Sequence, residues 1–160
     1  MPGGAPVQIA LLPRLPDGGF RAFVRFPAGW QRAEAGYYEV PEEFLIVEGE
    51  LHLNDRVWKT GGYAWVPAYQ RRHSLKTPGG CVAFAWFAAA PRWIPGEPPQ
   101  PAQGTGVAFA HWREAPAGRL YDGPEHRTWI ADGRELVRVA GAGAARETLD
   151  LASPDWKCGA

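Results

Sequence analysis

Short apolar segments separated by turn residues run along most of this chain, and none has the length and period of an amphipathic helix. The segment Phe20–Phe26 alternates apolar residues with arginines, which is the period-two pattern of a half-buried strand. Cys81–Phe87 is apolar throughout and is typical of a strand buried on both faces. Further strands are expected at Val7–Leu12, Glu43–Glu48, Glu50–Leu53, Arg56–Lys59, Tyr63–Val66, Thr128–Ile130, Glu135–Val139 and Glu147–Leu149.

Turn residues punctuate these segments. Asn54-Asp55-Arg56 and Asp132-Gly133 predict hairpin turns, because Asn, Asp and Gly tolerate a left-handed backbone. Ala88–Gln103 contains five prolines and is expected to be an extended arm over the outside or the mouth of the fold. Ala140–Ala145 is expected to be a flexible loop. About nine short strands without helices predict an all-β sandwich or barrel, and the shortage of charges that protect strand edges favours a closed barrel.

Length and charge narrow the class of protein. The 160 residues suit a single domain, in which residues 1–95 supply the core barrel strands and residues 96–160 supply the arm and C-terminal strands or a lid. Lys plus Arg and Asp plus Glu both number 17, so neither nucleic acid nor an anionic membrane is an expected partner. The N-terminal residues lack a signal-peptide pattern, and a cytoplasmic location is the expectation. Cys81 and Cys158 lack metal or disulfide spacing, and Cys81 is expected to be buried.

Two half-motifs stand close together between residues 36 and 73. Glu42 is followed after six residues by Gly49, and Gly61 is followed after five residues by Pro67. These pieces resemble the two-part signature of the cupin superfamily, and within it the ChrR-type cupins, a group that includes acetylacetone dioxygenase. The resemblance covers roughly Val7 to Pro95 and implies a single cupin (jelly-roll) barrel with a C-terminal extension.

The resemblance also implies a metal centre built on His-x-His, a glutamate and a further histidine. In this chain the His-x-His positions hold Gly36 and Tyr38, or Ala35 and Tyr37, and the later histidine position holds Arg72, with His73 one residue beyond it. We therefore expect no cofactor and no stoichiometric transition metal at a His-x-His site. A dioxygenase with unusual metal ligands remains an alternative.

The remaining polar groups of the two motifs define a candidate site at the barrel mouth. Glu42 is the candidate general base, Tyr38 or His73 the candidate acid, and Arg71 or Arg72 the candidate anchor for a carboxylate or oxyanion. Tyr37, Tyr63, Trp65 and Trp86 are the candidate aromatic residues for substrate binding, the last three as lining of the barrel. His52, His111 and His126 are interpreted as structural or exposed.

These residues are compatible with two classes of function. One is a metal-independent isomerase, epimerase or lyase that transfers protons on a small carbonyl or carboxylate compound. The other is a non-catalytic cupin that binds or senses a small molecule. Near-zero net charge and exposed proline-rich segments such as Pro91–Pro101 further predict a homodimer that buries an edge strand.

Overall fold

The computed structural model describes residues 5–13, 19–124, 126–140 and 145–151. Within these residues the only helical elements are two 3₁₀ turns, η1 (Trp112–Glu114) and η2 (Pro116–Gly118). Every strand pair is antiparallel. The all-β expectation is confirmed. No helix in the described residues is long and apolar enough to cross a membrane.

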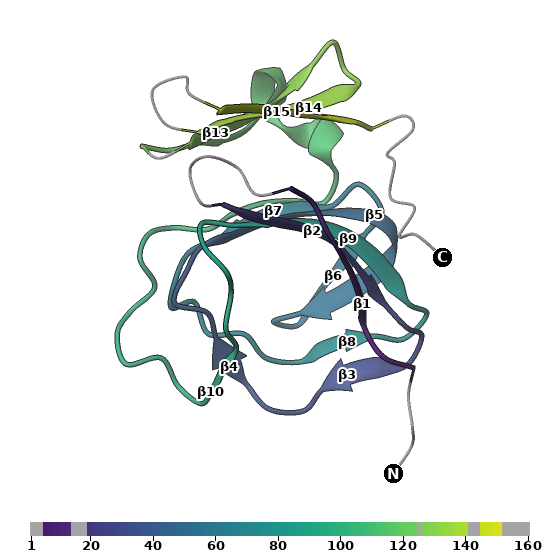
Figure 1. Ribbon diagram of the computed structural model, residues 1–160, viewed down its shortest axis with the longest axis vertical. Coiled ribbons are helices and arrows are strands. Elements are labelled where there is room, and N and C mark those ends of the chain that lie inside the picture. Colours follow the sequence, from purple (N-terminus) through teal and green to yellow (C-terminus); the bar gives the residue numbers. More distant parts are fainter. Residues whose placement is uncertain (1–4, 14–18, 125, 141–144, 152–160) are drawn as a thin grey trace.

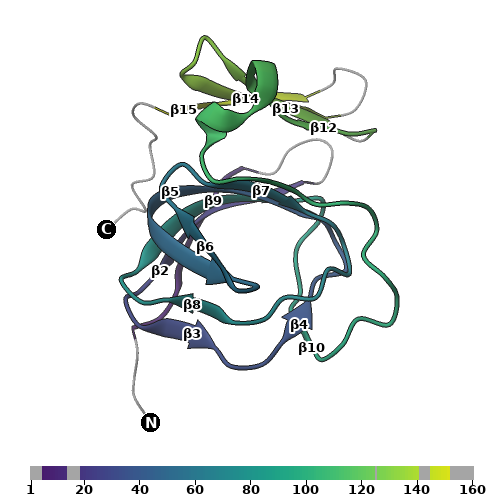
Figure 2. The same ribbon diagram turned by 180° about the vertical axis from the view of Figure 1, so that it is seen from behind.

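Two curved sheets form a barrel from the first 109 residues (Figures 1 and 2). Hydrogen-bonded neighbours follow the order β1-β2-β9-β5-β7-β11 in one sheet, while β3, β8, the second half of β5 and β6 make the other. The strands are β1 (Gln8–Leu11), β2 (Phe20–Phe26), β3 (Trp30–Arg32), β4 (Gly36–Tyr37), β5 (Glu42–Leu53), β6 (Arg56–Lys59), β7 (Tyr63–Val66), β8 (Leu75–Thr77), β9 (Cys81–Phe87), β10 (Ile94–Pro95) and β11 (Val107–Phe109).

Strand β5 belongs to both sheets and therefore closes the barrel. Its first half pairs with β7 and β9, and its second half pairs with β6 and β8. The register against β9 shifts between Ile46 and Glu48, next to Gly49, whose φ is +76°. A Cβ at Gly49 would lie 2.2 Å from the Gly80 carbonyl oxygen, so the change of sheet requires glycine there.

Side chains alternate between the two faces of β5. Phe44 and Ile46 point into the barrel and pack with Trp58, Cys81 and Phe87. Cys81 is buried, as expected, and this desolvation raises the pKa of its thiol to about 12. The opposite face of the same sheet also carries apolar residues, and a second layer covers them.

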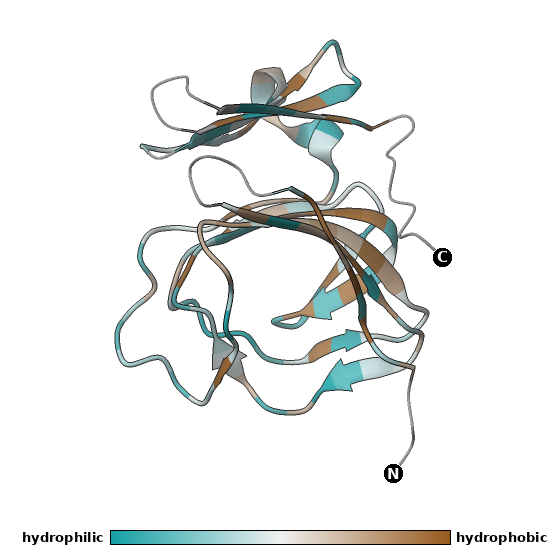
Figure 3. Ribbon diagram, viewed as in Figure 1, coloured by the Kyte–Doolittle hydropathy of each residue, from teal (hydrophilic) through white to brown (hydrophobic). Residues whose placement is uncertain are grey.

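That second layer is a four-stranded antiparallel sheet, β12 (Arg119–Asp122), β13 (His126–Ala131), β14 (Glu135–Ala140) and β15 (Ala145–Asp150). It lies on the outer face of the β2-β9-β5-β7 sheet (Figure 1). Both layers contain hydrophobic segments (Figure 3), and the buried cluster between them consists of Phe23, Leu45, Tyr63, Phe84, Trp86, Trp112, Ala115, Leu120 and Leu136. The C-terminal strands therefore cover the wall of the barrel.

Most long strands occur where the sequence predicts them, and the Asp132-Gly133 turn joins β13 to β14. The expected arm Ala88–Gln103 has bends and no regular structure apart from the two residues of β10, which pair with β4. This pairing is close: a Cβ at Gly36 would lie 2.5 Å from the Trp93 ring. Cys158 and the centre of the expected loop Ala140–Ala145 lie outside the described residues.

Candidate active site in the barrel and a buried network on its wall

Glu42 and Arg72 form an ion pair inside the barrel. Arg72 Nη1 donates a hydrogen bond to Glu42 Oε2, and the side chains are 4% and 12% exposed respectively. Glu42 begins β5 on the same face as Phe44, so the period of the strand directs its carboxylate inward. Arg72 exchanges two backbone hydrogen bonds with Gly36, at 2.8 and 3.0 Å, which fix the orientation of its side chain.

Tyr38 completes this group. The guanidinium carbon of Arg72 lies 4.7 Å from the centre of the Tyr38 ring, a cation–π contact. Burial raises the pKa of the Tyr38 hydroxyl, and the negative charge of Glu42 raises it further, whereas Arg72 and Arg32 lower it. The net direction is upward, so Tyr38 is protonated at neutral pH and its hydroxyl can donate a hydrogen bond. We call Tyr38, Glu42 and Arg72 the barrel cluster.

Two of the three guanidinium nitrogens of Arg72 donate no hydrogen bond to a described residue. Its Nε and Nη2 atoms are buried and have no hydrogen-bond partner among the described residues. These two nitrogens form one edge of the planar guanidinium group, and that edge matches the two oxygens of a carboxylate. A buried donor without an acceptor costs free energy, about 1–3 kcal/mol each, so this edge is a place where an acceptor is missing.

Two of the predicted polar residues lie elsewhere. Backbone pairing at Arg72 makes its neighbours point the opposite way, and Arg71 binds Glu97 on the surface, with an Nε–Oε1 distance of 2.6 Å. The His73 ring contacts Ser74 Oγ at 3.0 Å and lies 4.0 Å from the Asp55 carboxylate. The structure thus does not bring His73 together with Glu42.

Tyr37 is buried on β4, with its ring centre 5.9 Å from that of Tyr69.

The three aromatic residues expected to line the barrel lie on its outer wall, and that placement was wrong. Tyr63 and Trp86 belong to the apolar cluster between the barrel and the C-terminal sheet. Trp65 stacks on Tyr121 of β12, with ring centres 4.5 Å apart. The physical reason is the second layer: both faces of β7 and β9 are buried, so an apolar residue there need not face the interior.

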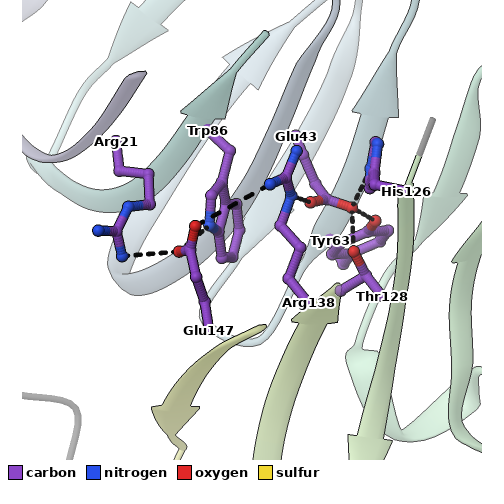
Figure 4. A network of polar contacts seen from close by, with 8 residues as sticks. All are labelled: Arg21, Glu43, Tyr63, Trp86, His126, Thr128, Arg138 and Glu147. Atoms are coloured by element: carbon purple, nitrogen blue, oxygen red, sulfur yellow. Dashed lines mark hydrogen bonds and ion pairs between the residues drawn. The ribbon is translucent and has the colours of Figure 1, made fainter. Parts of the chain in front are cut away.

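Glu43 is the centre of a buried polar network on this outer wall (Figure 4). Its carboxylate is 2% exposed and accepts hydrogen bonds from the Tyr63 hydroxyl on the barrel side and from Thr128 Oγ1, at 2.7 Å, on the C-terminal sheet. Arg138 Nε donates to Oε1 at 3.1 Å, and His126 Nε2 lies 3.4 Å from Oε2. Four groups from β7, β13 and β14 thus converge on a carboxylate of β5.

A second carboxylate extends the network. Glu147 of β15 accepts hydrogen bonds from Arg21 Nη1 at 2.7 Å and from Trp86 Nε1 at 3.2 Å, and it lies 4.0 Å from Arg138 Nη1. Each of the two glutamates therefore binds groups from the other layer. We call these contacts of Glu43 and Glu147 the intersheet network.

Opposing effects set the pKa values in the intersheet network. Burial raises the pKa of Glu43, but the hydrogen bond and charge of His126 and the charge of Arg138 outweigh it, and the net shift is downward. At Glu147 burial outweighs Arg21, Trp86 and Arg138, and its pKa is raised. Burial and Glu43 raise the pKa of Tyr63 well above its usual value, which keeps this hydroxyl a donor. The network has the groups of an acid–base site, but its members are buried between two packed layers.

The barrel cluster does not fit the metal centre that the cupin resemblance implies. In that resemblance Arg72 stands at the position of a histidine ligand, and a guanidinium has no lone pair to coordinate a cation and repels it. Gly36 and Tyr38, or Ala35 and Tyr37, stand where His-x-His would be. Among the residues that the structure describes, no three His, Cys, Asp or Glu side chains are grouped so that they could hold a metal ion. We therefore derive no chemical step through a metal.

No protein-family model and no curated protein matches this chain. Among solved structures, a candidate dioxygenase from Nostoc punctiforme superposes with a TM-score of 0.57 at 14% identity. The match covers 86% of this chain and 52% of that one, so this chain spans about half of its length.

Two further matches have TM-scores of 0.47. A candidate acetylacetone dioxygenase from Methylibium petroleiphilum is 16% identical, with 64% of this chain and 74% of that chain covered. An RmlC-like cupin protein from Ralstonia eutropha is 14% identical, with 58% and 62% covered. At such identities the likeness concerns the fold. The chain thus has an all-β fold of the cupin barrel type, with a four-stranded C-terminal sheet on the outer wall of its barrel.

Proposed function

We propose that this protein binds a small organic anion inside the barrel, with Arg72 as the anchor of the ligand's carboxylate. The observation that carries the proposal is the buried Nε and Nη2 edge of Arg72, which lacks an acceptor among the described residues. Nη1 is held by Glu42, so the guanidinium is fixed in place before a ligand arrives. A fixed guanidinium loses little entropy when it binds a carboxylate side-on.

Charge and hydrogen-bonding capacity support an anion of single charge. Arg72 and Arg32 act on Tyr38 as positive charges and Glu42 acts as a negative one, which leaves one net positive charge around the phenol. The Tyr38 hydroxyl adds a third donor. The two unpaired donors of Arg72 together with the Tyr38 hydroxyl match a carboxylate or an enolate oxygen pair better than a neutral amine.

Proton transfer on such a ligand is the second candidate function. Glu42 and Tyr38 flank Arg72, which supplies a base, an acid and an oxyanion anchor in one place. His73 takes no part, because its side chain lies on the other side of the chain segment. Exchange of α-protons for deuterium in a small keto acid, followed by NMR, tests this candidate: wild-type protein would catalyse exchange and Glu42→Gln would not.

Calorimetric titration tests the binding proposal. Acetate, benzoate and succinate are each compared with their amides, and the carboxylates are expected to bind more tightly. The variant Glu42→Gln/Arg72→Gln removes both charges and leaves neither side chain as an unpaired buried ion. It is expected to weaken carboxylate binding at least about 10-fold, since hydrogen bonds to charged groups contribute about 1.5–3 kcal/mol.

The matched control is Arg71→Gln, which removes an arginine that binds Glu97 at the surface one residue away. This variant should bind the carboxylates as the wild type does. Carboxylate affinity that is equal in wild type and double variant, or lost equally in the control, would refute Arg72 as the anchor.

A further inference from the structure

A groove of about 270 Å³ opens in the barrel wall between β6, an edge strand of one barrel sheet, and the paired strands β7 and β11 of the other sheet. Among the described residues β6 is hydrogen-bonded in a ladder to neither β7 nor β11. Trp58 of β6 lines it on one side, and Ala64 and Val66 of β7 line it on the other. Ala108 of β11 extends the second wall. We call this feature the seam groove. Its walls are mostly apolar, which suits the body of an organic ligand.

The polar side chains that line the seam groove include one cation and the amides of Asn54 and Gln70. Arg56 is the only charged residue that lines it, and its guanidinium carbon lies 4.2 Å from the Trp58 ring centre. Trp58 is 5% exposed, and its indole Nε1 is buried without an acceptor among the described residues. A groove with apolar walls, one cationic side chain and an unpaired N–H donor complements an apolar molecule that carries an anionic or acceptor group.

The seam groove adjoins the barrel cluster. In the β5–β7 register Val66 is directly opposite Glu42, and Ala64 is directly opposite Phe44. Directly opposite side chains of antiparallel strands share a face and lie about 4.5–5.5 Å apart. On the other side, Gln70 lines the groove and stands two residues before Arg72. The inner wall of the groove is therefore one side chain away from the Glu42–Arg72 pair.

We infer that the seam groove holds the apolar body of the ligand whose carboxylate binds Arg72, and that the ligand is an arylalkanoic or alkylalkanoic acid. This inference rests on the proposed function and adds the shape of the ligand to it. A groove of this volume takes a group of about ten non-hydrogen atoms. A linker of about two methylene groups spans the distance of about 4.5–5.5 Å between directly opposite side chains such as Val66 and Glu42.

Two carboxylate probes test the Arg72 anchor and the seam groove separately. Acetate is small enough to use only Arg72, whereas 3-phenylpropanoate adds a linker and a ring. We expect 3-phenylpropanoate to bind about 10-fold to 100-fold more tightly than acetate in calorimetry, because burial of the ring removes apolar surface from water. Ala108→Phe fills the groove from an exposed position and should reduce the affinity for 3-phenylpropanoate at least 10-fold. Its affinity for acetate should stay within twofold.

The matched control is Ala28→Phe, the same change at an exposed turn residue outside the seam groove, which should alter neither affinity. Nuclear Overhauser contacts between the ring protons of 3-phenylpropanoate and the methyl groups of Ala64 and Val66 give a second readout that needs no variant. They are expected in the wild-type complex.

The outcomes are distinct. If acetate depends on Arg72 but 3-phenylpropanoate gains nothing over acetate, or is unaffected by Ala108→Phe, the groove inference fails and the proposed function stands. If 3-phenylpropanamide binds as tightly as 3-phenylpropanoate, with the ring in the groove and no effect of Glu42→Gln/Arg72→Gln, the Arg72 anchor fails, and with it the assignment of an alkanoic acid.

Discussion

Glu42 and Glu43 are consecutive residues of β5, yet their carboxylates bind different arginines on opposite faces of one sheet. Glu42 binds Arg72 inside the barrel, and Glu43 binds Arg138 of the C-terminal sheet at 3.1 Å. Successive side chains of a strand point to opposite faces of the sheet, so the two consecutive glutamates lie on opposite sides of it. One peptide unit thus joins the candidate ligand site to the contact that holds the second layer.

Loss of the Glu43 charge should destabilise the fold. Glu43→Gln keeps the shape of the side chain but leaves Arg138 and His126 without their central carboxylate, and disruption of a buried ion pair costs about 3–5 kcal/mol. We expect a lower free energy of unfolding in urea by that order. Glu39→Gln, an exposed glutamate near the same strand, is the control and should be neutral. A Glu43→Gln protein as stable as the control would show that the network contributes nothing.

Stability should respond to pH in two opposite ways. Glu147 has a raised pKa in the folded protein, so its ionised form is a cost that disappears as the pH falls through that pKa, and stability should first rise. Glu43 has a lowered pKa, so its contribution is present above the ordinary glutamate range and is lost as the pH falls through the folded-state pKa.

Urea unfolding from neutral pH to about pH 2, well below the ordinary glutamate pKa of about 4.3, measures both effects. Glu147→Gln should abolish the rise, and the stability difference between wild type and Glu43→Gln should shrink at the acid end. A difference that grows on acidification would contradict the assigned direction at Glu43.

Much of the barrel could be predicted from the sequence, because Phe20–Phe26 and Cys81–Phe87 carry local strand patterns. The short strands β3, β4, β10 and β11 could not, since each has only two or three residues and exists through pairing with a distant segment. Strands β13, β14 and β15 were predicted but β12 was not, and nothing local indicated which face of the barrel they cover.

The candidate site was also predictable only where local sequence carried the signal. The motif positions identified Tyr38, Glu42 and Arg72, which the structure brings together. Glu43 was missed as a buried residue, because its partners His126 and Arg138 are 83 and 95 residues away. The only local signal was the uninterrupted apolar run after Glu43, which indicates burial on both faces and hence a carboxylate that must be paired.

Tyr38 should contribute to ligand binding through its hydroxyl. Tyr38→Phe retains the ring that packs on Arg72 and removes one donor, so carboxylate affinity should fall about 3-fold to 10-fold, the effect of one hydrogen bond. Tyr37→Phe is the matched control and should have no effect on affinity. Equal losses in both variants would argue for a general effect on β4, and no loss in Tyr38→Phe would remove the third donor from the site.

A homodimer remains a prediction. In the described part of the chain β1 is paired on one side only, and Ile9 and Leu11 are 58% and 64% exposed. An apolar edge strand is a surface on which a second copy can pair. We expect a dimeric mass by light scattering at tens of micromolar, and a monomeric mass for Ile9→Lys/Leu11→Lys. Val57→Lys, at another exposed apolar residue, should remain dimeric, and a monomeric wild type would reject the prediction.

The central claim is that the free edge of Arg72 binds a carboxylate, and the Arg72 Nε–Hε resonance reports on that edge directly. In a ¹⁵N NMR titration with acetate this resonance should move strongly downfield in ¹H as the site saturates, while titration with acetamide should leave it unchanged. The Arg71 Nε–Hε resonance should not follow it. An Arg72 signal that stays in place while acetate binds elsewhere, or no saturable binding of acetate, would contradict the account.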